Sequence, residues 1–127
     1  MYMHTLFKVT TTLVLIVSLL GCALDRNQLR DPFAAAAADT ITTSIALAQG
    51  ATEMNPLGPV GALAGKGVYL FGIRPRLSSE EQQHYDRVTG SLWFGAATNN
   101  LVQIISPGSH LVSIGLAVLV GWYIYRD

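Results

Sequence analysis

The chain has 127 residues, of which 50% are hydrophobic and only 13% are charged, and its mean hydropathy is +0.38. Eight basic residues balance eight acidic residues, so nothing indicates a basic surface for nucleic acid, and we expect no nucleic-acid partner. The composition is too apolar for an ordinary soluble domain of this length and predicts a membrane protein.

The first 21 residues have the pattern of a secretory signal peptide. Lys8 precedes an apolar run over residues 9–20, and small residues follow that run; these three features are typical of an exported chain. The end of the run, Leu19-Leu20-Gly21-Cys22, resembles the lipobox of bacterial lipoproteins. That resemblance implies cleavage before the cysteine, a diacylglyceryl group on its sulfur and a fatty acyl chain such as palmitate.

Cys22 is therefore the predicted lipidation site. It is the only cysteine, so an internal disulfide and a cysteine-based metal cluster are both excluded. The alternative is that residues 9–22 form an uncleaved membrane helix, in which Cys22 is a small buried hydrophobe.

Residues 22–32 form a polar linker, and residues 33–127 form the predicted helical membrane domain. The expected fold class is all-α, a membrane-embedded bundle of about four transmembrane helices after the signal segment. Asn55-Pro56 and the run from Ser106 to Ser109 are turn signals. Two overlapping pairs fit a capping box, Ser78 with Glu81 and Ser79 with Gln82. The predicted membrane helices are residues 33–52, 57–73, 88–105 and 110–125.

Two of these helices carry small residues on one side. In residues 57–73, Gly61 and Gly65 have the spacing that allows helices to approach closely in lipid. Ser91, Gly95, Thr98 and Val102 mark a similar stripe in residues 88–105. We expect the glycine stripe of residues 57–73 to be a packing face. The stripe of residues 88–105 is small and polar, and that helix inserts readily only if neighbouring helices satisfy its amides.

A set of ionisable and amide side chains lies at similar depths in the predicted bundle. Counting from the Asn55-Pro56 turn puts Lys66 level with residue 46, about 10 Å from both Asp39 and Glu53. The predicted intramembrane polar cluster is Asp39, Glu53, Asn55, Lys66, Asn99 and Asn100. Such groups are functional candidates in a membrane, but they also hold helices together. We favour the structural role, because interhelical polar contacts commonly contribute only about 1 kcal/mol and serve packing.

The same residues carry a resemblance to a family. Asp39, Thr42 and Thr43, then Gly50, Glu53, Asn55 and Pro56, followed by Lys66 and the Asn99-Asn100 pair, make up its pattern. This pattern resembles a family of small multi-helix membrane domains of unknown function in bacteria and archaea, over about residues 36–105. The resemblance implies a shared membrane scaffold and brings no activity with it.

No constellation for catalysis is apparent, and we expect neither an enzyme nor a cofactor. His4, His84 and His110 lie in different regions without ligand spacing, so no metal site is predicted. A weaker alternative is an intramembrane enzyme with Glu53 or Asp39 as acid or base.

The predicted function is that of a lipoprotein acting as a structural or accessory subunit. Its predicted location is the bacterial cell membrane, lipid-anchored and multi-pass, with the inner membrane favoured over the outer. Its expected partners are the lipid bilayer and either further copies of the chain or another membrane protein. The alternative is a small oligomeric pore or a proton- or ion-conducting protein that uses Asp39, Glu53 and Lys66.

Overall fold

The computed structural model describes residues 25–51 and 57–126, and every regular element within these ranges is a helix. Cys22, Glu53 and Asn55 lie outside the described residues. The elements are α2 (Arg26–Leu29), α3 (Pro32–Ala48), α4 (Gly58–Gly67), the π-helix η1 (Val68–Ile73), the 3-10 helix η2 (Arg74–Arg76), α5 (Ser79–Ile105) and α6 (His110–Tyr125).

Side-chain caps fix the starts of three helices. The carboxylate of Asp25 accepts a hydrogen bond from the backbone of α2, and that of Asp31 does the same for α3, where Pro32 occupies the first turn. Ser78 and Glu81 form the complete capping box at the start of α5, which confirms the predicted start signal.

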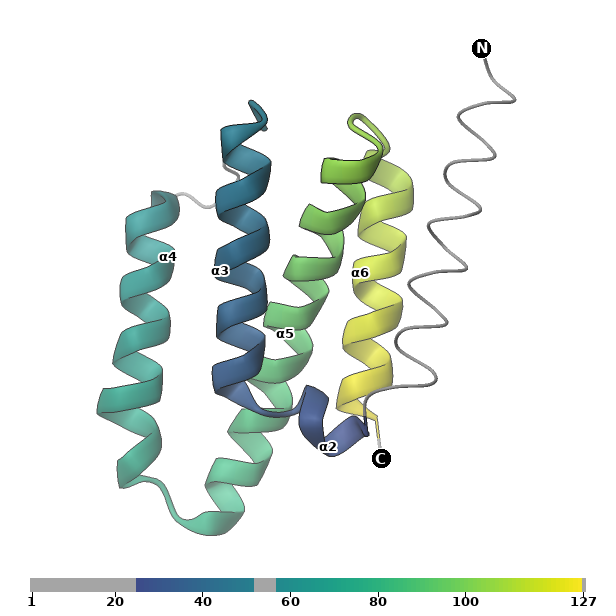
Figure 1. The fold of residues 1–127 in the computed structure, drawn as a ribbon. Helices are drawn as coiled ribbons and strands as arrows, with labels where there is room; N and C mark the ends of the chain where they lie inside the picture. The colour runs from purple at the N-terminus through teal and green to yellow at the C-terminus, as the bar shows by residue number, and fades with distance from the viewer. Residues whose placement is uncertain (1–24, 52–56, 127) are drawn as a thin grey trace.

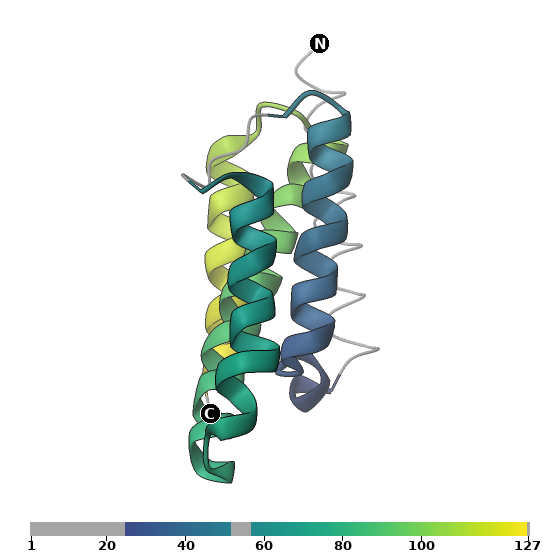
Figure 2. The same cartoon turned by 90° about the vertical axis from the view of Figure 1, so that its left-hand side faces the viewer.

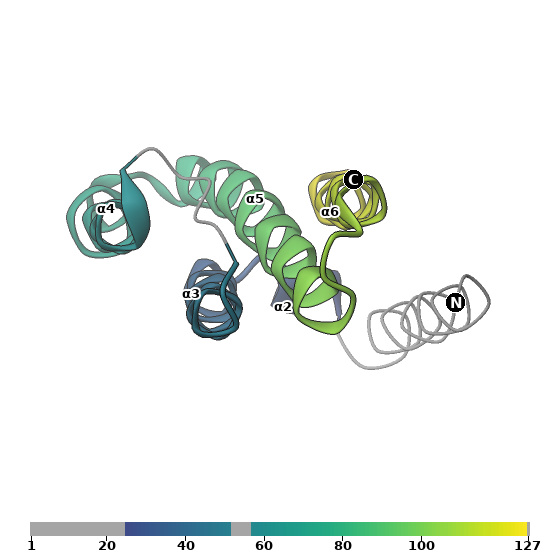
Figure 3. The same ribbon diagram turned by 90° about the horizontal axis from the view of Figure 1, so that it is seen from above.

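The longest helix, α5, is the centre of the arrangement. α5 packs most extensively against α6 and α3, which lie to either side of it when the molecule is viewed from above (Figure 3). α4 stands beside α3, and the two run side by side in both side views (Figures 1 and 2). The direct contact between α3 and α4 is small.

Small residues allow the close crossings of α5. A Cβ atom added to Gly95 would lie 3.0 Å from the carbonyl oxygen of Ala117, and one added to Gly121 would lie 3.1 Å from that of Ser91. The predicted small-residue stripe of α5, from Ser91 to Val102, is buried at all four of its positions. Side chains larger than hydrogen at the two glycines would therefore push α5 and α6 apart.

The predicted packing face of α4 is wrong for this single chain. A Cβ atom added to Gly65 would meet nothing within 4 Å, and one added to Gly61 would meet only Leu57 of the same segment. Val60 and Leu63 on α4 are also exposed. Instead, α4 is held to α3 by the ion pair of Lys66, and the aromatic rings of η1 contact α3 and α5.

The prediction of a membrane-embedded bundle with about four transmembrane helices is wrong. No described helix combines the length and the apolarity that a membrane crossing requires. α3 has 17 residues and α6 has 16, fewer than the roughly 20 of a typical crossing. α5 has 27 residues, but Glu80, Glu81 and Asp86 interrupt its apolar pattern. α4 has 10 residues before the backbone changes to a π-helix at Val68.

Candidate functional site

Lys66 and Asp39 form a buried ion pair between α4 and α3. The Lys66 Nζ atom lies 2.7 Å from Oδ2 of Asp39, and the two side chains are only 8% and 13% exposed. Lys66 also donates to the Thr40 hydroxyl at 3.2 Å. The hydroxyl-rich run DTITTS therefore supplies both acceptors that hold the ammonium group.

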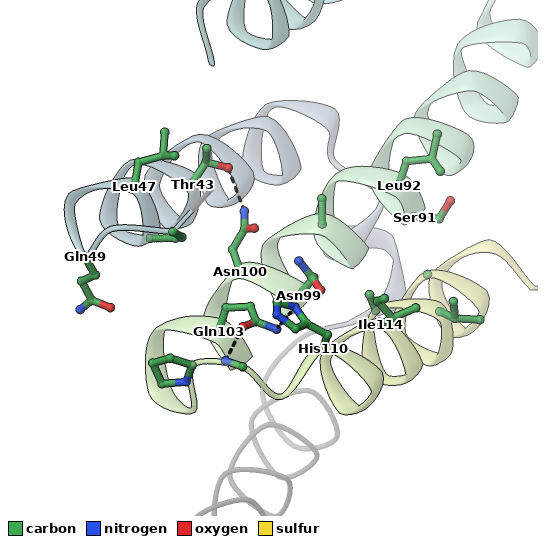
Figure 4. Close-up of a pocket in the computed structure, with 18 of the residues that line it drawn as sticks. Thr43, Leu47, Gln49, Ser91, Leu92, Asn99, Asn100, Gln103, His110 and Ile114 are labelled. Carbon is green, nitrogen blue, oxygen red and sulfur yellow. Dashed lines mark hydrogen bonds between the residues drawn. The ribbon is translucent and has the colours of Figure 1, made fainter. Parts of the chain in front are cut away.

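Asn100 of α5 joins this pair from the third side. Its amide nitrogen donates to the Thr43 hydroxyl at 2.8 Å and to Asp39 Oδ1 at 3.3 Å, and the bond to Thr43 is drawn in Figure 4. The Thr43 hydroxyl in turn lies 3.4 Å from Asp39 Oδ1. The carboxylate of Asp39 thus accepts hydrogen bonds from residues of α3, α4 and α5.

The structure therefore brings together three members of the sequence-predicted cluster, namely Asp39, Lys66 and Asn100. Asn99, next to Asn100, is half-buried. It lines two cavities, one among α3, α5 and α6 and the other among α3, α4 and α5. Sequence reasoning missed the contribution of Thr40. The sequence did contain a signal for this contribution, because Thr40 places a hydroxyl directly after Asp39 in the run DTITTS.

The arrangement is suited to holding helices together. The positive charge of Lys66 and the negative charge of Asp39 neutralise each other, and every neighbouring polar group described above donates to the carboxylate or accepts from the ammonium group. A buried ion of this kind is tolerated only while its partner is present. Over the described residues, no group of three or more His, Cys, Asp or Glu side chains is placed to hold a metal ion.

A second polar cluster, which the sequence analysis did not predict, ties η1 and η2 to α5. Arg74 binds Asp86 through two hydrogen bonds of 2.8 Å each, and the Tyr69 hydroxyl donates to the same carboxylate at 3.0 Å. Burial, followed by the hydrogen bond to Asp86, raises the pKa of Tyr69 to about 12. The hydrogen bond to Asp86 also raises the pKa of Arg74.

Aromatic rings accompany this second cluster. The ring of Tyr69 meets that of Trp93 edge-on, and Phe71 meets Phe33 of α3 in the same way, each at a centroid distance of 5.9 Å. η1 thereby contacts both α3 and α5. A sequence signal existed in Arg74 and Asp86, which flank the Ser78 cap.

No protein-family model, curated protein or solved structure matches this chain. The resemblance to small multi-helix membrane domains therefore stays a prediction.

Proposed function

We propose that the chain is a lipid-anchored accessory protein of a bacterial cell membrane, attached through Cys22, with its helical part acting by binding and support. The ion-conducting alternative depends on helices that cross the bilayer, and no described helix meets that requirement. The opposite charges of Lys66 and Asp39 are used to join helices, which favours a supporting role over proton transfer.

The observation that carries the proposal is a cluster of arginine and aromatic side chains at one end of the bundle. This is the end where α2, the first described helix after Cys22, meets the C-terminus of α6. α2 begins four residues after Cys22 and lies beside the C-terminal end of α6 (Figure 1). The Arg26 guanidinium lies 4.9 Å from the centre of the Tyr123 ring. The Arg126 guanidinium lies 4.7 Å from the centre of the Trp122 ring.

This end has the chemistry of a membrane–water interface. Trp122 and Tyr125 are 58% and 47% exposed, and tryptophan and tyrosine are enriched at the level of lipid headgroups. Arginine side chains can lay their apolar stems on such rings while the charge remains hydrated. An acylated Cys22 would hold this end close to the bilayer surface.

The same end is also rigidly built. Arg30 donates to the carbonyl oxygen of Ile124 at 2.9 Å and to that of Arg126 at 2.7 Å. These carbonyls end α6, where a positive charge is favourable because of the helix dipole. These hydrogen bonds tie the end of α2 to the end of α6.

The test is incorporation of labelled palmitate into the wild-type chain and into the Cys22→Ala variant. We expect the wild-type chain to incorporate labelled palmitate and to partition with detergent-phase proteins, and we expect the Cys22→Ala variant to lose the label. A matched control adds Ser109→Cys to the Cys22→Ala chain, which restores a thiol away from the lipobox and should not restore the label. Equal labelling of wild type and Cys22→Ala would overturn the proposal.

A further inference from the structure

A groove lies along α5, bounded by α3 and α6. Its volume is about 1020 Å³, at the upper limit of the roughly 300–1,000 Å³ that small-molecule sites occupy. Figure 4 shows the labelled residues of α3, α5 and α6 arranged around it. From Leu92 to Gln103 the lining follows α5 for about 16 Å, at 1.5 Å per residue.

The lining changes in character along its length. At one end lie Gln49, Asn99, Gln103 and His110, close to the turn between α5 and α6. Toward the other end the lining residues are chiefly apolar, and they include Leu92, Ile114, Val118 and Trp122. A ligand that matches the groove therefore has a polar head and an apolar body.

The described part of the groove contains no fixed charge to pair with an ionised ligand. None of the described lining residues is Asp, Glu, Lys or Arg. The nearby Lys66 lines the neighbouring cavity and is bound to Asp39. An ionised head group would lose water without gaining a counter-ion, which is costly. The head group should therefore be uncharged.

The polar end also has a side chain ready to bind such a head. Gln103 is already occupied, since it donates to Ser113 Oγ at 2.8 Å and accepts from the Gly108 backbone at 3.1 Å. Asn99 has no hydrogen-bond partner for its amide among the described residues, although it is half-buried and lines the groove. Its amide offers both a donor and an acceptor, as a hydroxyl or ester group requires.

We infer that the groove binds a single-chain lipid with an uncharged, hydrogen-bonding head group, of the monoacylglycerol type. The acyl chain lies along Leu92, Ile114 and Val118, and the head group meets Asn99. This site is separate from the acylation of Cys22, and the inference does not rest on the proposed anchoring.

The test uses the full chain carrying Cys22→Ala, so that the protein's own predicted lipid cannot fill the groove. In detergent micelles, a monoacylglycerol bearing a photoreactive diazirine in its acyl chain is cross-linked to the protein, and the labelled peptides are identified by mass spectrometry. We expect labels on the peptides that contain Leu92, Ile114 and Val118. Unlabelled 1-monooleoylglycerol should compete with the probe, whereas oleate should compete at least about tenfold less well.

Two neighbouring residues of α6 provide the matched variants. Val118 lines the groove and is 64% exposed, whereas Leu119 does not line it and is 60% exposed. Val118→Asp should weaken specific labelling at least about tenfold, because the new carboxylate meets the acyl chain, and Leu119→Asp should leave it unchanged. Asn99→Leu should remove the preference for monooleoylglycerol over oleate. Circular dichroism verifies that the variants are helical.

Three results would overturn the inference. They are labelling spread evenly over the exposed apolar residues, equal competition by oleate and by monooleoylglycerol, and equal losses in Val118→Asp and Leu119→Asp. Each of these is independent of whether wild-type Cys22 is acylated.

Discussion

Replacing Lys66 by methionine should destabilise the fold severely, because it leaves the carboxylate of Asp39 buried without a counter-ion. Lys66 as a whole residue is 7% exposed, and its ammonium group lies 2.7 Å from that carboxylate. Removing one partner of a buried pair costs about 3–5 kcal/mol. For a domain of this size, that loss lowers Tm by more than about 10 °C.

The assay is thermal and urea unfolding of the purified chain, followed by circular dichroism. Arg76→Met is the matched control, because Arg76 is exposed and its replacement should change the free energy of unfolding by less than about 0.5 kcal/mol. The double variant Lys66→Met with Asp39→Leu removes both charges, and it should lie within about 1–2 kcal/mol of wild type.

The pattern among these variants decides the role of the pair. The structural account requires a large loss in Lys66→Met and recovery in the double variant. A change in Lys66→Met as small as that in Arg76→Met would refute the reasoning, since the buried carboxylate would then have cost nothing.

Four further predictions concern other parts of the structure. Gly90→Ala should destabilise the protein by about 1–3 kcal/mol in urea unfolding, because the new Cβ atom would lie 2.9 Å from the Leu29 carbonyl oxygen. Gly65→Ala should stabilise it by up to about 1 kcal/mol, since nothing lies within 4 Å; the same sign for both would contradict the described packing. Tyr69, whose pKa is raised from 10.0 to about 12, should contribute stability below its unfolded pKa that is lost as the pH rises through its folded pKa. The absorbance of the phenolate in the wild-type chain follows the titration, and unfolding of wild type and of Tyr69→Phe at several pH values measures the contribution. The same pH dependence of stability in both proteins would contradict it. Ser78→Ala should cost about 0.5–2 kcal/mol through loss of the α5 cap, and a stability equal to wild type would show that the capping box is not needed.

Local signals predicted the helices well where turn chemistry is strong. The predicted range 110–125 agrees with α6, which begins after the turn that contains Pro107 and Gly108. Proline has no backbone N–H to continue a helix, and Gly108 takes a φ of +86° there. The first predicted helix was too long, because Gly50 takes a φ of +88° just after α3 ends. A glycine in this conformation commonly ends a helix.

The membrane arrangement was wrong for a different reason. Composition measures how apolar a chain is, but it does not reveal whether apolar residues face lipid, each other or a groove. In this fold Ala46, Val102 and Val120 are buried between helices, so part of the high hydropathy serves internal packing.

Parts of the candidate site followed from helical spacing, and parts did not. Counting from the turn put Lys66 level with residue 46 and about 10 Å from Asp39, as members of one polar cluster. The structure places the Lys66 ammonium group 2.7 Å from the Asp39 carboxylate, closer than that count predicted. The second cluster depends on the π-helix over Val68–Ile73, which alters the register of Tyr69 and Arg74 relative to an ordinary α-helix. No simple sequence period predicts that change.

Mass spectrometry of the mature amino terminus tests the proposed anchoring most directly. The account predicts a chain that begins at Cys22 and carries a diacylglyceryl group on sulfur together with an amide-linked acyl chain. A mature chain that retains residues 1–21 with an unmodified Cys22 would contradict it.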